Sequence, residues 1–305
     1  MAEVVPGVVV TFFPDEAFAR RLARVAREVS PLLVVDNSTE AGVRASVART
    51  AAETGAEYVA QSRNRGIAGG LNAGFSALVQ RGHRAAVAFD QDSTPDPGCA
   101  AALCTSARAD SKRAIVGSNW FDEARPEFGS RHLQPHPWLP GAFRRVRAGA
   151  QDLGGVTFVI ASGSWFDLQC WESLGGFDAA LFLDLVDVDF CLRARRLGRT
   201  VAVAAAARLA HNRGSKRPIR CAGRTWWPAF MPPARLRGLF ANRIRLLVRH
   251  GWSNLHWVSY EACSSLKILG EIIFLEDQKR EKLTAVLAGC VDAVAGRIPP
   301  DQRVV

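Results

Sequence analysis

Long apolar segments are absent from this sequence of 305 residues. A membrane-spanning helix needs roughly 18 or more uninterrupted apolar residues, and the best candidate stretch, 266–275, is broken by Lys267 and Glu271. The first residues carry neither a basic cluster nor an apolar segment before a cleavage site, which argues against a secretory signal. We therefore expect a cytoplasmic protein without a transmembrane helix.

Several common site motifs are absent as well. The seven cysteines include no pair with the two-residue spacing of a zinc or redox site, and scattered cysteines of odd number are typical of reduced thiols in a cytosolic protein. The glycine-dense run 63–74 has neither the glycine order of a dinucleotide-binding loop nor the lysine of a P-loop. Dinucleotide and ATP binding are thereby disfavoured.

Acidic residues are missing from one long stretch. Between Phe190 and Tyr260 the chain has no Asp or Glu but fifteen Lys or Arg residues, and the net charge of the whole chain is +10. Such a stretch can attract nucleic acid, anionic lipid or diphosphate. Arginine here is interleaved with tryptophan, which suits a membrane interface at least as well as a nucleic-acid groove. These tryptophans are Trp226, Trp227, Trp252 and Trp257.

The rest of the composition is that of a globular protein, with 48% hydrophobic and 22% charged residues. In the first half, strand patterns occur at 8–13, 32–35, 57–60, 85–89 and 115–117, and helix patterns at 16–29, 41–54, 67–80 and 98–109. Continuous apolar strands alternating with helices indicate an α/β fold with a mostly parallel central sheet and helices on both faces.

The second half is less regular. Residues 121–149 hold scattered prolines and charges, which indicates a long loop or lid. Strands are then expected at 156–160 and 200–209, and helices from Cys170 and over 187–197. Three further helix patterns, at 234–249, 253–276 and 279–294, indicate a C-terminal helical extension.

Polar residues stand where successive strands end: Thr11, Asp36 and Asp90. Ligands of parallel sheets bind beyond these carboxyl ends. Asp90 and Asp92 would repel each other there unless a cation lay between them. A divalent ion whose shell is completed by a diphosphate fits this pair. The alternative, a turn or helix cap, suits Asp92 or Ser93 but leaves Asp90 unexplained.

Two other groups have both a functional and a structural interpretation. The run 63–74 combines a helix N-terminus with two arginines, a natural anion site, although Gly70 and Gly74 also suit tight helix–sheet packing. Among the acidic residues at 184–189, Asp187 is the candidate general base, whereas Asp184 and Asp189 also suit the start of a helix. His211 follows a strand and is either a further metal ligand or a structural histidine.

In this order, the elements resemble the inverting family 2 glycosyltransferases, and they are most similar to bacterial rhamnosyltransferases of surface-polysaccharide assembly. The matching stretches are 9–15, 34–38, 64–74, 90–93, 162–164, 175–178, 181–184, 186–193 and 211–214. One departure is Val186, which stands where the family usually has the first residue of a Glu-Asp pair, while Asp187 matches the second.

The resemblance implies a GT-A fold over residues 1–214, with a nucleotide-sugar half at about 1–120 and an acceptor half at about 150–214. Residues 215–305 would then be a basic, tryptophan-containing helical extension that associates with a membrane. The resemblance also implies roles for single residues: Asp187 as the base; Thr11, Asp36, Asn64, Arg65, Gly66, Asn72 and Asp90 at the nucleotide-sugar; Asp92 and His211 at Mg²⁺ or Mn²⁺; and Ser162, Gly163, Asp184 and Asp189 on the acceptor side.

The implied activity is transfer of a sugar from a nucleotide-sugar donor, dTDP-L-rhamnose, to a polyprenyl-diphosphate-linked or growing polysaccharide. The enzyme would work at the cytoplasmic face of the inner membrane. A sugar-nucleotide pyrophosphorylase would need a glycine-rich, lysine-containing loop near the N-terminus, where this chain has Pro14 and Asp15. A nucleic-acid-binding protein would use the basic stretch but leave Asp36, Asp90, Asp92 and Asp187 without a purpose, so no nucleic-acid partner is expected.

Overall fold

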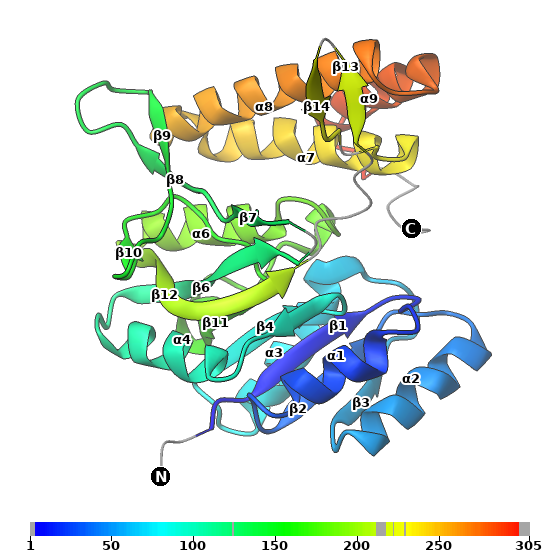
Figure 1. Ribbon diagram of the computed structural model, residues 1–305, viewed down its shortest axis with the longest axis vertical. Helices are drawn as coiled ribbons and strands as arrows, with labels where there is room; N and C mark the ends of the chain where they lie inside the picture. Colours follow the sequence, from blue (N-terminus) through cyan, green and yellow to red (C-terminus); the bar gives the residue numbers. More distant parts are fainter. Residues whose placement is uncertain (1–3, 124, 212–217, 222, 229, 299–305) are drawn as a thin grey trace. The chain divides into compact units, whose positions relative to one another are not determined.

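The computed structural model describes residues 4–123, 125–211, 218–221, 223–228 and 230–298 (Figure 1). The chain forms two compact units. The first unit comprises Met1–His132, Arg145–Phe182 and Val186–His211, and the second comprises Leu133–Arg144, Leu183–Leu185 and Asn212–Val305. The domain boundary expected at residue 214 lies outside the described residues.

The first unit is built on a ten-stranded sheet in the order β10-β12-β6-β11-β4-β1-β2-β3, with β5 beside β12 and β7 beside β6. β1 pairs in parallel with both β2 and β4, β2 with β3, and β12 with β6, while β11 runs antiparallel between β4 and β6. The strands are β1 Gly7–Thr11, β2 Leu32–Asp36, β3 Glu57–Ala60, β4 Ala85–Asp90, β5 Ser93–Pro95, β6 Arg113–Asp122, β7 Arg125–Gly129, β10 Leu153–Gly154, β11 Ser164–Asp167 and β12 Thr200–His211.

Helices cover both faces of this sheet, because alternate side chains of each strand point to opposite faces. On one face, Val9, Val34 and Phe89 belong to a core with α1 (Phe18–Val25), α2 (Ala41–Glu53) and α4 (Cys99–Arg108). On the other face lies α3 (Gly66–Gln80). Its Phe75 joins an aromatic cluster of Phe166, Trp171, Phe177 and Phe190, which includes side chains of α5 (Leu168–Ser173) and α6 (Val186–Arg196). The expected mostly parallel α/β architecture is confirmed.

Gly70 and Gly74 let α3 lie unusually close to the sheet. A Cβ atom added at Gly70 would lie 2.5 Å from Val10 Cγ1, and one added at Gly74 would lie 2.5 Å from Val8 Cγ1. Real Cβ atoms do not approach so closely, so helix and sheet would have to separate. The packing interpretation of these two glycines is therefore confirmed.

Two secondary-structure predictions are wrong. Residues 121–149 are not a plain loop, because β6 continues to Asp122 and β7, β8 (His132–Pro135) and β9 (Phe143–Val146) follow. Prolines do not exclude strands in this segment: Pro126 lies in β7, which among the described residues pairs with β6 alone, and an edge strand tolerates a missing N–H. Residues 156–160 are not a strand, although Val156 and Val159 are buried; the strands of this region are β10, before them, and β11, after them.

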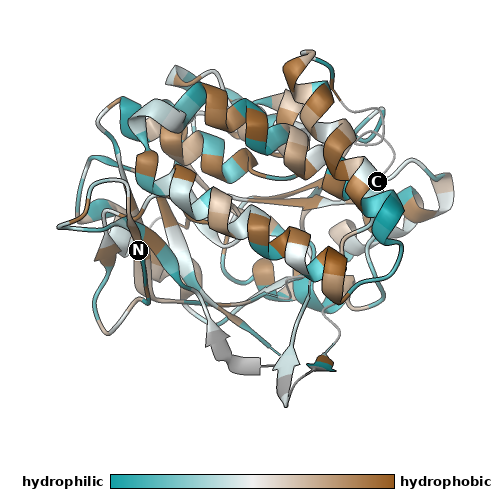
Figure 2. Ribbon diagram, turned by 90° about the horizontal axis from the view of Figure 1, so that it is seen from above, coloured by the Kyte–Doolittle hydropathy of each residue, from teal (hydrophilic) through white to brown (hydrophobic). Residues whose placement is uncertain are grey.

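The second unit consists mainly of helices, with apolar residues, brown in Figure 2, alternating with polar ones along them. Its elements include α7 Pro233–His250, η2 Gly251–Ser253, α8 Leu255–Phe274, α9 Lys279–Val294, and the hairpin of β13 Ile219–Cys221 with β14 Arg224–Trp226. Leu236, Phe240, Ile272 and Val286 form its core. Among the described residues, none of the helices combines the length and apolar character that crossing a bilayer requires.

One buried histidine makes the stability depend on pH. His132, the first residue of β8, is buried, its Nε2 has no hydrogen-bond partner among the described residues, and burial lowers the pKa of His132 to about 4. The unfolded chain binds this proton near pH 6.5, so stability is present above that pH and is lost as pH falls towards 4. We expect the free energy of unfolding to fall by up to about 3 kcal/mol over this window.

Denaturant unfolding of His132→Gln between pH 7 and 4 measures this contribution. The variant is expected to lose clearly less stability over that range than the parent chain. His83→Gln, a change at a partly exposed histidine, is the control and is expected to keep the parent slope. Equal slopes for His132→Gln and the parent chain would contradict the assignment.

Candidate active site

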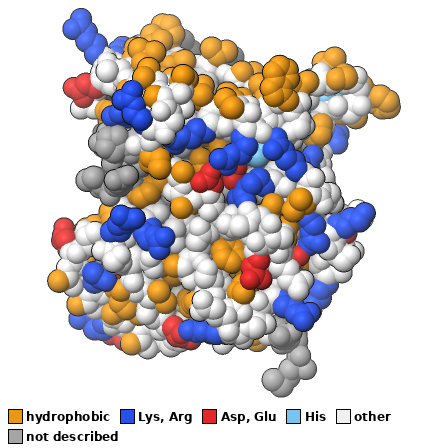
Figure 3. Space-filling model, turned by 180° about the vertical axis from the view of Figure 1, so that it is seen from behind, with side chains coloured by type: hydrophobic (Ala, Val, Ile, Leu, Met, Phe, Trp, Pro, Cys, Tyr) orange, Lys and Arg blue, Asp and Glu red, His pale blue; other side chains and the backbone are white. Residues whose placement is uncertain are grey.

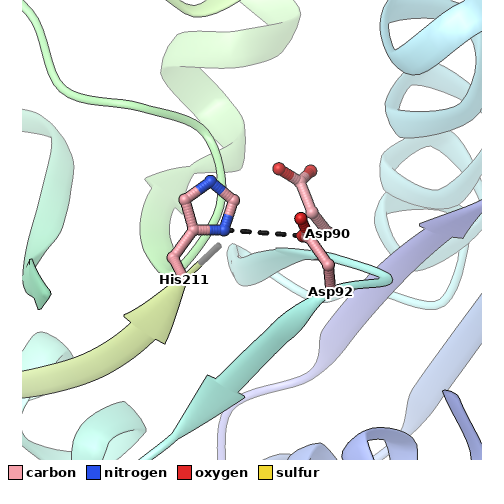
Figure 4. Close-up of side chains that lie close together, drawn as sticks. All are labelled: Asp90, Asp92 and His211. Atoms are coloured by element: carbon pink, nitrogen blue, oxygen red, sulfur yellow. Dashed lines mark ion pairs between the residues drawn. The ribbon is translucent and has the colours of Figure 1, made fainter. Parts of the chain in front are cut away.

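Strand pairing brings Asp90, Asp92 and His211 together. Asp90 ends β4, a turn over Gln91 and Asp92 follows, and β5 then runs antiparallel to β12 with Ser93 opposite His211. One ligand atom from each of Asp90, Asp92 and His211 lies within 4.8 Å of the others (Figure 4). Residues more than a hundred positions apart in the sequence thus form one candidate metal site at the end of the sheet.

The donors of this cluster fit a divalent cation. Asp92 Oδ1 lies 3.5 Å from His211 Nδ1, and this buried oxygen has no hydrogen-bond partner among the described residues. A buried carboxylate oxygen without a partner costs free energy unless a cation or a donor satisfies it. Asp90 belongs to the same cluster, whereas the sequence analysis placed it on the nucleotide side and gave the metal to Asp92 and His211.

Two buried serine hydroxyl groups connect the Asp90 backbone to the His211 ring. The Asp90 N–H donates to Ser162 Oγ (2.9 Å), Ser162 Oγ lies 2.6 Å from Ser93 Oγ, and Ser93 Oγ lies 3.0 Å from His211 Nδ1. Ser93 and Ser162 are both buried. Ser162 was expected on the acceptor side, and Ser93 was considered only as a turn or cap residue, because the pairing of β5 with β12 alone shows what Ser93 touches.

Gln91 holds the turn that carries the two aspartates. Its Oε1 accepts hydrogen bonds from Thr11 Oγ1 (2.8 Å) and from the Phe12 N–H (2.7 Å), and its carbonyl accepts one from Arg21 Nε (2.9 Å). Gln91 was missed in the sequence, where it stood only as the spacer of the motif. Thr11, expected at the nucleobase, is buried with its hydroxyl bonded to Gln91.

Asp36 is fully buried at the end of β2. Its Oδ1 accepts from the Ser38 N–H (2.8 Å) and its Oδ2 from the Tyr58 hydroxyl (3.0 Å). Burial is the main cause that raises the pKa of Tyr58, so this hydroxyl stays protonated and continues to donate. These bonds fix the loop after β2, and a direct nucleobase contact for Asp36 stays a prediction.

The glycine-dense run opens α3 as expected. Gly66 has a φ of +66°, and a Cβ atom there would lie 2.2 Å from the Phe182 carbonyl oxygen, so a side chain is excluded. The Gly66 N–H donates to Asn64 Oδ1 (2.9 Å), whereas the side chains of Arg63 and Arg65 are exposed. The amide group of Asn72 bonds the backbone of Phe177 and is therefore less available to a ligand than these arginines. Its Nδ2 donates to the Phe177 carbonyl and its Oδ1 accepts from the Phe177 N–H, both at 2.9 Å.

The acidic residues near α6 have different surroundings. Asp187 is partly exposed in the first turn of α6, where its Oδ1 accepts from the Val188 N–H (2.8 Å) and its Oδ2 from the Ala161 N–H (3.3 Å). Asp189 is fully buried, with Oδ2 2.7 Å from Arg193 Nε. Asp184 belongs to the second unit and pairs with Arg235 at 2.9 Å.

Gly163 lies just before β11 with a φ of +65°. Its N–H donates to the Ala88 carbonyl of β4 (2.8 Å), and its carbonyl accepts from the Ser118 N–H of β6 (3.0 Å). Gly163 thereby joins the strands on both sides. The acceptor-side roles of Ser162, Gly163, Asp184 and Asp189 stay predictions.

Sequence comparison places this arrangement among known proteins. The profile of the glycosyltransferase-like family 2 matches residues 8–227. The dTDP-rhamnosyl transferase RfbF of Shigella flexneri is 26% identical over 212 residues, which cover 69% of each chain. An uncharacterized protein of Mycobacterium tuberculosis is 28% identical over 198 residues, which cover 63% of this chain and 67% of the relative.

Solved structures share the fold at low sequence identity. The mannosyltransferase PcManGT of Pyrobaculum calidifontis, solved with GDP-Man and Mn²⁺, gives a TM-score of 0.52 at 15% identity over 95% of this chain and 86% of its own. TarS 1–349 of S. aureus gives 0.57 at 12% identity, over 97% and 82%. GalNAc-T7, solved with UDP, GalNAc and Mn²⁺, gives 0.55 at 11% identity over 81% of this chain, which spans only 48% of that protein. With a GT-A fold, a candidate metal site at the end of its sheet and a family profile matching residues 8–227, this chain belongs to the glycosyltransferase-like family 2.

Proposed function

We propose that this glycosyltransferase transfers L-rhamnose from dTDP-L-rhamnose, with inversion, to a hydroxyl of a lipid-linked or growing cell-surface polysaccharide at the cytoplasmic face of the inner membrane. The observation that carries the catalytic part is the cluster of Asp90, Asp92 and His211 at the end of the sheet. The donor sugar is supported by the similarity to a dTDP-rhamnosyl transferase. A lipid-linked acceptor accords with the basic, tryptophan-containing stretch.

Asp92, His211 and Asp90 would hold Mn²⁺ or Mg²⁺. Carboxylate oxygens suit both ions, and the imidazole favours Mn²⁺. When bound, such an ion stabilises the negative charge of the departing diphosphate. Arg63 and Arg65, both exposed near the start of α3, add positive charge for the phosphates.

Asp187 acts as the general base in this proposal. It removes the proton from the acceptor hydroxyl, whose oxygen attacks the anomeric carbon while the bond to the nucleoside diphosphate breaks on the opposite side. A single displacement of this kind inverts the configuration. The two backbone N–H groups that bond the Asp187 carboxylate hold it in one orientation.

Donor binding and hydrolysis test the proposed function. Calorimetry with dTDP-L-rhamnose, UDP-galactofuranose, UDP-glucose and UDP-GlcNAc, each with and without Mn²⁺, is expected to show metal-dependent binding that is tightest for dTDP-L-rhamnose. Slow release of dTDP from that donor is expected in the absence of an acceptor. Tighter binding of another nucleotide-sugar would overturn the donor, and binding that ignores the metal would overturn the role of the cluster.

Ser93 is expected to orient His211 for metal binding, since its hydroxyl lies 3.0 Å from the ring nitrogen. Ser93→Ala should lower the affinity for Mn²⁺ by roughly 10- to 100-fold, as losses of partners behind metal ligands do. Electron paramagnetic resonance of free and bound Mn²⁺ measures this without turnover. Ser173→Ala, at a hydroxyl that bonds the Cys170 carbonyl in α5, is the control and should leave Mn²⁺ affinity unchanged.

A further inference from the structure

Five large apolar side chains of the second unit are exposed near one end of α8. Trp138 and Leu139 lie at the tip of the β8–β9 hairpin, Val248 lies near the end of α7, Trp252 in η2, and Leu255 at the start of α8. Trp138 is 87% exposed and Trp252 is 93% exposed. We call these five residues the Trp surface. Figure 3 shows apolar side chains, in orange, on the projecting hairpin tip at the upper right.

Local contacts hold the hairpin against α8, so the Trp surface is one built feature. The Ser259 hydroxyl bonds the carbonyl of Gly141 at 2.7 Å, and a Cβ atom at Gly141 would lie 3.6 Å from Leu255 Cβ. Behind the tip, the rings of Phe143 and Tyr260 meet edge to face at 5.6 Å. Trp138 and Leu139 are therefore presented beside the start of α8 by a supported loop.

The tryptophans of the basic stretch differ in exposure. Trp257 is fully buried in the second unit, whereas Trp252 is exposed. The partner of Trp252 on the Trp surface is Trp138, which lies in the stretch predicted to be a lid. Its contribution was hidden in the sequence because more than a hundred residues separate the hairpin from α8.

The two segments that carry the Trp surface hold charged side chains of one sign. The segments 133–144 and 245–260, which carry the surface, contain no Asp or Glu. Arg144 and Arg249 are exposed in them. On α8 itself the two acidic residues, Glu261 and Glu271, are buried and paired with Arg243 and Lys267. The exposed part of these segments therefore combines indole rings with arginine side chains.

We propose that the Trp surface docks the protein on the headgroup region of an anionic phospholipid bilayer. Tryptophan is enriched at that depth because its ring is apolar and its N–H is polar, and arginine beside it pairs with phosphate. A second copy of this chain is a poorer occupant, because each copy carries a net charge of +10 and the surface offers no acid to pair with the arginines of its partner. The inference rests on the proposed function only in that a lipid-linked acceptor gives the docking a purpose.

Vesicle binding by the full chain tests this inference. Sedimentation with phosphatidylcholine vesicles, with and without phosphatidylglycerol, is expected to show binding to the anionic vesicles that weakens as salt rises. Trp138→Ser with Trp252→Ser should lower the partition coefficient by roughly tenfold for each indole removed. Arg144→Gln with Arg249→Gln should mainly remove the preference for anionic lipid. Brominated lipids should quench the fluorescence of the parent chain and much less that of the double Trp variant.

A control removes two other exposed apolar side chains, outside the Trp surface. Val291→Ser with Val294→Ser on α9 should bind vesicles like the parent chain. Equal loss of binding in this control and in the Trp variant would overturn the assignment to the Trp surface. So would equal binding to neutral and anionic vesicles at all salt concentrations.

Two further measurements separate the possible failures. Metal-dependent hydrolysis of the donor in solution should be the same in the Trp variant and the parent chain, so absent vesicle binding with intact hydrolysis overturns the docking and leaves the proposed function standing. Light scattering after gel filtration reports self-association. A dimer that Trp138→Ser with Trp252→Ser dissociates, with vesicle binding unchanged, would assign the Trp surface to a second copy and overturn the inference.

Discussion

Asp187→Asn is expected to lower kcat by roughly 10²- to 10⁴-fold, the range typical of a lost general base. The amide cannot take the proton from the acceptor hydroxyl, but it keeps the size of the carboxylate and accepts hydrogen bonds through its oxygen. Its one oxygen can therefore still accept from the Val188 N–H, the shorter of the two bonds at 2.8 Å, while the bond from the Ala161 N–H at 3.3 Å is lost. Affinity for the donor and for Mn²⁺ should stay close to that of the parent chain.

Steady-state rates with a soluble acceptor, together with calorimetry for the donor, separate these two effects. Asp178→Asn is a matched control, because Asp178 also accepts a backbone N–H at the start of a helix, from Ala180 at the start of η1 (Ala179–Leu181). It should retain turnover. Weakened donor binding with near-normal kcat in Asp187→Asn would remove Asp187 from the role of base.

The second large effect is expected at Asp92. Asp92→Asn should lower the affinity for Mn²⁺ by about 100-fold or more, beyond the usual loss for a residue behind a metal ligand, and metal-dependent turnover should fall with it. The cause is direct: the variant removes the negative charge of the buried oxygen that faces His211 at 3.5 Å. Titration of Mn²⁺ by electron paramagnetic resonance measures the affinity without donor or acceptor.

Two comparisons sharpen this experiment. Asp96→Asn changes a carboxylate just beyond β5 and should leave Mn²⁺ binding intact. Asp90→Asn tests the division of roles within the pair: a loss of Mn²⁺ affinity makes Asp90 a ligand, whereas weaker donor binding at normal Mn²⁺ affinity places it on the nucleotide side. Unchanged Mn²⁺ binding in Asp92→Asn would refute the metal site as assigned.

The first half of the fold was predictable because its strands are nearly uninterrupted runs of buried apolar residues. Val8, Val9 and Val10 are all buried, as are Leu32 to Val35, because both faces of the sheet are covered. Residues 121–167 were not predictable in the same way. There, strand formation depends on the pairing partner, such as β6 for β7 and β4 for β11, and not on a local pattern.

The candidate site was likewise only partly predictable from the sequence. Asp90, Asp92, Asp187 and His211 stand out in the sequence because a charged or metal-binding side chain directly follows a buried strand or opens a helix. Gln91 and Ser93 carry no such signal, since their meaning comes only from Thr11 on β1 and His211 on β12. The hydrogen bond from Tyr58 to the buried Asp36 could not be predicted either. A polar residue at the end of a strand gives the same sequence pattern whether its side chain contacts a ligand or the protein.

The place of β11 in the sheet has a consequence for synthesis on the ribosome. β11 is inserted between β4 and β6, both of which precede it in the chain. Until residues 164–167 leave the ribosome, the nascent protein exposes open backbone edges on β4 and β6, the kind of edge that recruits foreign strands. His211 emerges later still, so the complete set of candidate metal ligands exists only after the sheet has closed. We therefore expect the metal to bind only after β11 has paired with β4 and β6. Chains released before residue 164 has been synthesised should aggregate.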